Sequence, residues 1–223
     1  MEEHIVKIIS VTNVTNDVKC FRVEKPEGYN FISGQATDVS INTEDLKNEK
    51  RAFTFTSLNS DPYLEFTIKR YPQRLSITNL IHGLKENDEL ILHEVFGDIS
   101  YKGEGVFIAA GAGITPFISI IRQLKSNYSL GNNMLVFANK TKADIIRENE
   151  FRELLGKNFI NILSEEKYNE YSFGFISEEF LVATVKDFEK FFYVCGPPSM
   201  MDNVIPILLK LGVSNDRLVF DPV

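Results

Sequence analysis

The first half of the chain is a series of short runs in which apolar and polar residues alternate. Six such runs lie between His4 and Glu94: HIVKIISV, VKCFRVE, ATDVSI, RAFTFTS, YLEFTIKR and ELILHE. Breaker segments such as EKPEGYN and NSDP separate them. A two-residue period with turn-forming segments between the runs is typical of antiparallel strands. The pattern predicts an antiparallel sandwich or barrel, interrupted by one short helix at about residues 78–84.

The second half has a different period. The continuous apolar run Val106–Ala110 has the character of a strand that is buried on both faces of a parallel sheet. A helix beginning at Pro116 follows it, with an apolar stripe at helical spacing. The alternation continues with strands MLVFAN, FINIL, FFYVC and RLVF, and with helices near residues 148–155, 177–182 and 200–211. Five strands that alternate with helices predict a doubly wound parallel sheet.

Composition and charge exclude several classes of function. The 223 residues carry 24 Lys and Arg against 31 Asp and Glu, and the net charge of -7 argues against a nucleic-acid-binding face. Two cysteines are too few for an iron–sulfur cluster with four thiolates, and the three scattered histidines suggest no metal site. The N-terminus opens with acidic residues, and no apolar run reaches about 18 residues. We therefore expect a cytoplasmic protein that binds neither nucleic acid nor membrane.

The segment GAGITP, Gly111–Pro116, lies between the first buried strand and its helix. Glycines at such a turn let backbone amides approach a phosphate at the helix N-terminus. By itself the motif also fits a tight turn that binds no ligand.

A second segment, CGPPSMMD, follows the fourth buried strand. Its Gly-Pro-Pro turn holds Cys195 at the carboxyl edge of the sheet, where ligands bind in open α/β folds. A cysteine that ends a buried strand is more often just a small apolar residue. Cys20, in the middle of a strand of the first half, is interpreted as a packing residue.

Two segments of the first half combine cations, hydroxyls and an aromatic ring. In RAFT, alternation places Arg51 and Phe53 on one side of the strand and Thr54 on the other. An arginine binds phosphate through two N–H groups, a ring covers a flat heterocycle, and a hydroxyl donates to a ring nitrogen. In KRYPQRLSITNLI, three cations precede Ser76 and Thr78, either of which is able to cap the short helix. An ordinary edge strand and a solvated turn are the alternatives.

Taken in this order, the motifs resemble those of the ferredoxin-NADP reductase-like flavoproteins, in the branch of NADH-dependent haem-protein reductases and flavodoxin reductases. RAFT matches the family's R-x-[YF]-[ST] flavin signature, GAGITP its G-x-G-x-x-P nicotinamide signature, and CGPPSMM its C-G-P-P-x-M segment. The resemblance spans nearly the whole chain. It implies an antiparallel six-stranded β-barrel that binds FAD at residues 1–100. An α/β domain with a doubly wound parallel five-stranded sheet, which binds NAD(P), would follow at residues 101–223.

The resemblance also implies roles for single residues. Arg51 would contact the FAD pyrophosphate, Phe53 would lie against the isoalloxazine ring, and Thr54 would hydrogen-bond the nitrogen that accepts hydride. Cys195 would lie beside the nicotinamide carbon, where its thiol shapes the site rather than acting as a nucleophile. Thr54 and Cys195 are thus the expected catalytic residues. The expected cofactor-binding residues are Arg51, Ala52, Phe53, Thr54, Ile68, Lys69, Leu75, Ser76, Ile77, Thr78, Gly111, Gly113, Ile114, Thr115, Pro116, Asn139, Cys195, Gly196, Pro197 and Met200.

The third buried strand favours NADH over NADPH as the reductant of FAD. It ends in Leu163-Ser164-Glu165-Glu166, where relatives that use NADPH often carry Ser-Arg, and two carboxylates would repel the 2′-phosphate. Phe175 stands where an arginine is common in NADPH users. Lys140 and Lys142 argue the other way, because both are able to bind a phosphate.

Electrons must leave for a separate acceptor, since the chain contains no cluster ligands. The expected acceptor is a redox partner protein, namely a ferredoxin, flavodoxin, haem protein or oxygenase component, and the reductase itself is expected to be a monomer. Lys69, Arg70 and Arg74 would steer an acidic partner, or would turn inward as a phosphate cradle. Phe220 is interpreted as a residue of a buried strand rather than as a cover for the flavin.

Two other functions are alternatives. Free flavin as the acceptor would make the chain a flavin reductase. A barrel that has lost its flavin would leave a nucleotide-sensing or scaffolding module, although the intact set of Arg51, Phe53 and Thr54 weighs against this.

Overall fold

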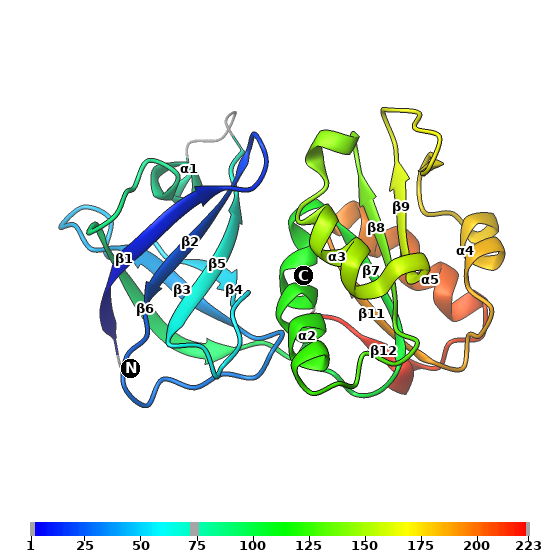
Figure 1. Cartoon of the computed structure of the whole chain (residues 1–223), viewed down its shortest axis with the longest axis horizontal. Helices are drawn as coiled ribbons and strands as arrows, with labels where there is room; N and C mark the ends of the chain where they lie inside the picture. The colour runs from blue at the N-terminus through cyan, green and yellow to red at the C-terminus, as the bar shows by residue number, and fades with distance from the viewer. Residues whose placement is uncertain (1–2, 72–75, 222–223) are drawn as a thin grey trace. The chain divides into compact units, whose positions relative to one another are not determined.

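The computed structural model describes residues 3–71 and 76–221 and divides the chain into two compact units. The first unit consists of Met1–Ser100 together with Thr115–Gln123, and the second of Tyr101–Ile114 together with Leu124–Val223. Figure 1 shows an antiparallel sheet in the first unit and a helix-covered parallel sheet in the second. The predicted fold class, antiparallel followed by parallel α/β, is confirmed.

The first unit contains the six predicted strands. They are β1 (His4–Asn13), β2 (Val18–Glu24), β3 (Ala36–Ile41), β4 (Arg51–Thr54), β5 (Tyr63–Lys69) and β6 (Glu89–Phe96), in the order β4-β3-β6-β1-β2-β5. An isolated antiparallel bridge between Phe55 and Phe66 joins the two ends of this order. The sheet therefore closes on itself just after the RAFT strand.

Alternation along these strands supplies the core of the first unit. Phe21, Phe55 and Phe66 are fully buried inside it, and Phe31 stacks on Phe55 with the ring centroids 4.2 Å apart. Complete burial of one such side chain contributes about 1.5–3 kcal/mol. Cys20 is buried and is not part of a disulfide, which agrees with its interpretation as a packing residue. The short helix α1 (Ile77–Ile81) lies close to its predicted position.

The second unit is a fully parallel sheet of six strands, one more than the sequence predicts. The strands are β7 (Gly105–Ala110), β8 (Met134–Asn139), β9 (Phe159–Leu163), β10 (Ser172–Phe173), β11 (Phe191–Cys195) and β12 (Leu218–Val219), in the order β10-β9-β8-β7-β11-β12. The unpredicted strand, β10, has only two residues, and its segment YNEYSFG has no continuous apolar run like the one in RLVF.

The longer helices of this half agree with the predicted ones to within a few residues. They are α2 (Thr115–Ser126), α3 (Glu148–Leu155), α4 (Glu178–Thr184) and α5 (Pro198–Lys210). Helix α5 begins two residues before Met200 because prolines fit the first turn, where their missing N–H removes no hydrogen bond. Thr115–Gln123 of α2 belong by their contacts to the first unit, although they follow β7 in the sequence. The domain bounds 1–100 and 101–223 stay a prediction.

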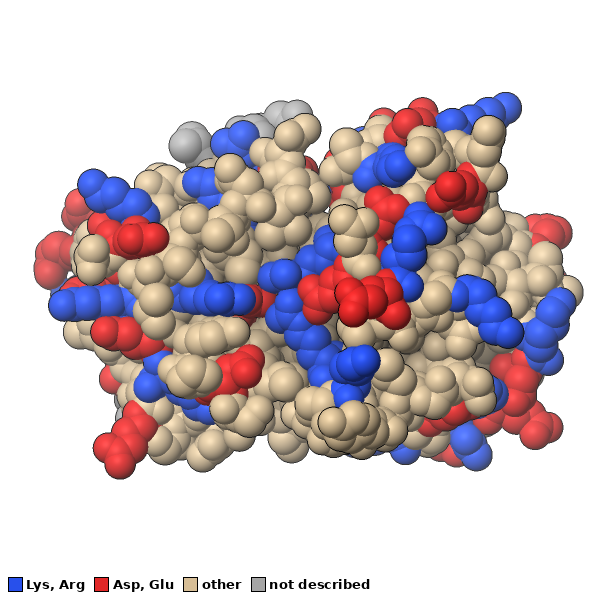
Figure 2. All heavy atoms as spheres, in the orientation of Figure 1, with Lys and Arg blue, Asp and Glu red and all other residues tan. Residues whose placement is uncertain are grey.

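Charge is distributed in small groups of both signs. Figure 2 shows Lys and Arg side chains interspersed with Asp and Glu side chains on the drawn face of each unit. No helix within the described residues is both long enough and apolar enough to cross a membrane. Among the same residues, no group of three or more His, Cys, Asp and Glu side chains is placed to hold a metal ion.

Candidate active site

The RAFT strand presents three groups that are open to a ligand. Arg51 is exposed, and its Nη1 donates to the carbonyl of Lys50 at 3.1 Å. Phe53 is half-buried and packs against the core of the first unit. Thr54 is half-buried opposite Ala36 of β3. Within the described part of the chain, neither an ion pair of Arg51 nor a hydrogen bond of the Thr54 hydroxyl occurs.

The cationic segment that begins at the last residue of β5 is less available to a ligand than its sequence suggests. Lys69 Nζ forms an ion pair with Asp17 Oδ2 at 3.0 Å, and only 16% of the Lys69 side chain is exposed. The backbone of exposed Arg70 also bonds to Asp17, through its N–H. The predicted cradle residue Leu75 and the predicted cation Arg74 lie outside the described residues. A cradle or steering role of Lys69 therefore has to act through a charge that Asp17 already balances.

Ser76, Ile77 and Thr78 form the start of α1. Ser76 is the N-cap residue, and its side chain makes no capping hydrogen bond. Ile77 is buried in the core, whereas Ser76 and Thr78 are half-buried. The geometry leaves both hydroxyls as candidates, so the choice between Ser76 and Thr78 stays open.

His82 anchors this segment, a role that the sequence does not reveal. Its Nε2 lies 2.7 Å from the carbonyl oxygen of Ile68, and its ring packs edge-on against Phe21. Lys19 Nζ donates to the His82 carbonyl at 2.8 Å. Burial, with a smaller effect of nearby Lys19, lowers the pKa of His82, so the ring is neutral at pH 7. One helix end is thereby fixed to the strand that carries Lys69.

In the second unit, the two glycine motifs flank the point where the strand order reverses. From β7 the chain runs outward through β8, β9 and β10, and it then returns to the opposite side of β7 with β11 and β12. GAGITP follows β7 and CGPP follows β11, its immediate neighbour. Ligands of open α/β sheets bind at the carboxyl ends of the strands at such a switch point. The fold therefore brings together two motifs that lie about 80 residues apart in the sequence.

The two glycines of the turn serve different purposes. Gly111 adopts a left-handed backbone with φ +51, and an added Cβ would meet nothing within 4 Å. A Cβ at Gly113 would overlap the carbonyl oxygen of Cys195 and approach the Cα of Gly196 to 2.7 Å. Sequence reasoning assigns both glycines to the space that a phosphate needs. Only Gly111 has open space, because Gly113 is packed against the end of β11.

The remaining predicted residues of the two motifs are distributed between core and surface. Ile114 and Pro116 are buried, Thr115, Gly196 and Met200 are half-buried, and Pro197 is exposed. Gly196 has close neighbours on both sides, since a Cβ there would overlap Met200 Cε and lie 3.2 Å from the Cβ of Ala110. The small side chain at Ala110 therefore keeps the turn workable.

Cys195 is half-buried at the end of β11. Burial, with a further contribution from the nearby carboxylate of Asp221, raises the pKa of its thiol to about 12. Since the thiolate is the nucleophilic form of cysteine, this thiol is unreactive at neutral pH. The environment agrees with a residue that shapes a site rather than one that attacks a substrate.

Asn139 ends β8, beside the glycine turn, and is 8% exposed. Its side-chain Oδ1 and Nδ2 are both buried, and neither has a hydrogen-bond partner within the described residues. A buried amide without partners costs about 1–3 kcal/mol. A polar ligand that reached this edge of the sheet would relieve that cost. Asn139 therefore has a side-chain amide available to a polar ligand, and its role in a dinucleotide site stays a prediction.

The lysines after β8 are occupied by their neighbours. Lys140 Nζ forms an ion pair with Glu165 at 2.8 Å, and this bond raises the pKa of Lys140. Lys142 Nζ lies 2.7 Å from the Tyr168 hydroxyl and 4.1 Å from the centre of its ring. Glu166 accepts a hydrogen bond from the Lys142 backbone N–H at 2.7 Å. Both carboxylates thus lie beside the cations that would bind a 2′-phosphate.

Phe175 and Phe220 differ in their exposure to solvent. Phe175 is 78% exposed after β10. Phe220 follows β12 and packs, partly buried, against the core of the second unit. This packing supports the interpretation of Phe220 as a residue of the hydrophobic core.

Comparison with known protein families gives a match in the second half of the chain. Residues 107–205 match the family described as the oxidoreductase NAD-binding domain. The matched range contains the glycine turn, Asn139 and the CGPP segment.

Curated relatives cover most of the chain. The reductase component of propane 2-monooxygenase from Rhodococcus jostii (strain RHA1) is 28% identical over 235 aligned positions, which cover 96% of this chain. The glycine betaine monooxygenase reductase subunit of Pseudomonas aeruginosa is 29% identical over 231 positions, again with 96% of this chain. The chain spans 62% of the length of each of these two relatives.

Solved structures share the two-part fold. The FAD/NAD-binding domain of nitric oxide dioxygenase from Vibrio cholerae superimposes with a TM-score of 0.86 at 20% identity, covering 97% of both chains. A ferredoxin NADP+ reductase from Neisseria gonorrhoeae, solved with bound FAD and NADP, gives a TM-score of 0.82 at 19% identity and covers 99% of this chain and 98% of that one.

Proposed function

Because this chain belongs to the ferredoxin-NADP reductase-like family of FAD- and NAD(P)-dependent reductases, we propose that it transfers hydride from NADH to FAD and passes the electrons to a separate redox partner. The observation that carries the proposal is the pair of motifs, GAGITP and CGPP, at the switch point of the parallel sheet. The FAD signature in the first unit complements it, since Arg51 forms no ion pair and the Thr54 hydroxyl forms no hydrogen bond with any described residue.

The chain's residues fit FAD on the first unit. Arg51 would bind the pyrophosphate, since its guanidinium is exposed and forms no ion pair within the described residues. Phe53 would support the flat ring system, and the Thr54 hydroxyl would hydrogen-bond the ring nitrogen where hydride arrives. Bound FAD supplies the ability to take two electrons as hydride and release them singly.

The second unit fits a nicotinamide dinucleotide. Gly111 leaves open space at the turn, and the backbone amides at the start of α2 would face the phosphates. Asn139 would use its unpartnered amide on a polar group of the ligand. Cys195, held as a neutral thiol, would contact the nicotinamide ring and exclude water without attacking it.

NADH is the preferred reductant in this proposal. A 2′-phosphate carries close to two negative charges and requires unpaired cations. Lys140 is already paired with Glu165, and Glu166 lies against the Lys142 backbone. The additional phosphate of NADPH would have to displace Glu165 and approach Glu166.

The acceptor is proposed to be a redox partner protein. The relatives from Rhodococcus jostii and Pseudomonas aeruginosa are reductase components of monooxygenases, so an oxygenase component or a ferredoxin is the favoured partner. Flavodoxins, haem proteins and free flavin are the other acceptors to compare.

Spectroscopy of the purified chain tests this function. FAD bound in about equal molar amount should give a yellow protein, and anaerobic NADH should bleach it faster than NADPH does. A colourless chain that gains no flavin absorption when FAD is added would refute the proposal and favour a flavin-free module. Turnover with a ferredoxin that slows as salt increases would support a charged protein partner, whereas equal rates with free flavin at all salt concentrations would support a flavin reductase.

A further inference from the structure

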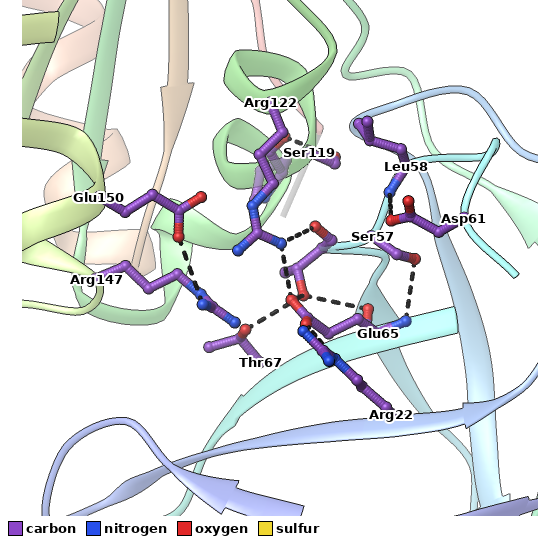
Figure 3. A network of polar contacts seen from close by, with 12 residues as sticks. Arg22, Ser57, Leu58, Asp61, Glu65, Thr67, Ser119, Arg122, Arg147 and Glu150 are labelled. Carbon is purple, nitrogen blue, oxygen red and sulfur yellow. Dashed lines mark hydrogen bonds and ion pairs between the residues drawn. The ribbon is translucent and has the colours of Figure 1, made fainter. Parts of the chain in front are cut away.

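A buried carboxylate on β5, that of Glu65, joins the segment just after the RAFT strand to helix α2 in the first unit. Only 1% of the Glu65 side chain is exposed. Its Oε1 lies 2.8 Å from Arg122 Nη1 on α2, and its Oε2 lies 3.1 Å from Arg22 Nε on β2. Figure 3 shows Glu65 between the two guanidinium groups. The Thr56 hydroxyl donates to the same Oε1 at 3.0 Å.

Arg122 also binds the segment just after the RAFT strand directly. Its Nη1 donates to the Thr56 carbonyl at 2.7 Å, and the Thr56 N–H donates to the Glu65 carbonyl at 2.7 Å. The guanidinium of Arg122 thus bonds to both segments that meet where the barrel closes, namely the one after β4 and strand β5. A second tie exists at Ser119, whose hydroxyl accepts a hydrogen bond from the Gly34 N–H at 3.1 Å.

Burial of a charged group is unfavourable unless partners with good geometry surround it. Removal of Arg122 would take away the guanidinium that faces Oε1 from α2, while Arg22, whose side chain is 47% exposed, would still face Oε2. Contact with α2 therefore adds to the charge balance of the buried carboxylate.

The position of this network along the chain connects it to the proposed reaction. Thr56 lies two residues after Thr54, the hydroxyl proposed to bind the flavin nitrogen, in the segment that directly follows β4. Helix α2 begins at Thr115, directly after the glycine turn proposed to bind the dinucleotide. Glu65 therefore contacts both the strand segment that follows the flavin contacts and the helix that follows the dinucleotide contacts.

We propose that Glu65, acting through Arg122, is a positioning residue for flavin reduction, which fixes the start of α2 relative to the Thr54 strand. This inference rests on the proposed function. Hydride transfer is sensitive to such placement, because a displacement of about 1 Å at a reacting centre can cost roughly 100-fold in rate.

Two arginines on one carboxylate provide a matched comparison. Arg122→Ala removes the hydrogen bonds from α2 to Thr56 and Glu65, and Glu65→Gln replaces the carboxylate of both ion pairs with a neutral amide, whereas Arg22→Ala removes only the partner on β2. Anaerobic stopped-flow should give a limiting rate of FAD reduction by NADH that falls roughly tenfold or more in the first two variants. The rate for Arg22→Ala should stay within about twofold, and the FAD affinity of all three should change little.

Hydrogen exchange of the FAD-free protein supplies a readout that does not depend on activity. The amides of Thr115–Gln123 should exchange faster in Glu65→Gln and Arg122→Ala than in Arg22→Ala. In the FAD-loaded protein after anaerobic reduction, the charge-transfer absorbance band that forms with NAD+ should weaken in the same two variants. Arg122→Lys, which keeps the charge, should restore part of the rate and of the band.

Equal slowing of flavin reduction by Arg22→Ala and Arg122→Ala would overturn the proposal and leave Glu65 as a stabiliser of the barrel only. Unchanged exchange of α2 in Arg122→Ala would also overturn it. If Glu65→Gln does not fold, Arg122→Ala and Arg122→Lys decide the question alone. A wild-type protein that stays colourless with FAD, or whose bound FAD is not bleached by NADH, would refute the proposed function. The exchange experiment would still report whether Glu65 holds α2 against the barrel.

Discussion

Gly113 packs directly against the backbone of Cys195, so closely that a Cβ at Gly113 would overlap the Cys195 carbonyl oxygen. The two residues belong to different sequence motifs and meet because β7 and β11 are neighbouring parallel strands. The turn after β7 and the end of β11 therefore form a single structural unit at the switch point of the sheet.

This contact predicts unequal effects of alanine at the two glycines of the turn. Gly113→Ala should destabilise the protein by about 1–3 kcal/mol, because backbone atoms have to move. It should also weaken NADH binding, since both motifs shift. Gly111→Ala, with free space but a left-handed backbone, should cost only about 1 kcal/mol. Urea unfolding measures the loss of stability and NADH titration the loss of affinity. Equal losses in Gly113→Ala and Gly111→Ala would contradict the close packing at Gly113.

Arg51 is predicted to dominate the polar affinity for FAD. Its loss in Arg51→Ala should weaken FAD binding by about 1.5–3 kcal/mol, the contribution of hydrogen bonds to a charged group. Arg51→Lys should retain part of the affinity, because lysine keeps the charge but not the two-pronged geometry. Flavin fluorescence during titration of the FAD-free protein gives both constants. Wild-type affinity in Arg51→Ala would exclude a pyrophosphate contact.

The raised pKa of Cys195 predicts an unreactive thiol. Below pH 9, alkylation by iodoacetamide should be much slower in the folded protein than in the unfolded protein, and mass spectrometry locates the modified residue. The unfolded chain releases this proton near pH 9 and the folded chain only near pH 12, so this group makes stability fall as pH rises between the two values. Cys195→Ala should remove that contribution. Rapid alkylation at pH 7 would show that the thiol is activated.

Glu165 is predicted to oppose NADPH. Glu165→Gln releases Lys140, and the kcat/KM for NADPH relative to NADH should rise by at most about fivefold, because an exposed ion pair contributes up to about 1 kcal/mol. Thermal stability should hardly change, since 71% of Lys140 and 56% of Glu165 is exposed. Glu153→Gln, on the exposed side of α3, is the matched control. If Glu165→Gln leaves the ratio of kcat/KM for NADPH and NADH unchanged, Glu165 does not discriminate between the two cofactors.

His82 predicts a loss of stability in mild acid. Burial lowers its pKa in the folded state below the ordinary 6.5, so its stabilising contribution is present above pH 6.5 and is lost as pH falls through the folded-state pKa. Thermal unfolding at pH 7.5 and 5.5 should show a smaller pH effect in His82→Gln than in the wild type. Identical pH dependence in the wild type and His82→Gln would refute this assignment.

The sequence determined much of the fold through local periods. Runs such as VKCFRVE and ATDVSI have the bounds of β2 and β3, because alternation is set by the two faces of each strand. It also supplied the residues of both candidate sites, since glycine turns and the RAFT signature depend on local backbone chemistry. It did not predict β10, because the segment YNEYSFG has no continuous apolar run. Nor did it predict the anchoring role of His82, because its partners Ile68 and Phe21 are distant in the chain.

Only the tertiary structure decided which residues already have a partner or a close neighbour within the protein. The sequence marks Lys69, Lys140 and Gly113 as open to a ligand, yet Asp17, Glu165 and the Cys195 backbone lie against them. Likewise, nothing in the sequence joins Glu65 to Arg122, 57 residues later. Local patterns report what each residue is able to do, whereas packing between distant strands and helices determines which partner satisfies its charge or fills its space.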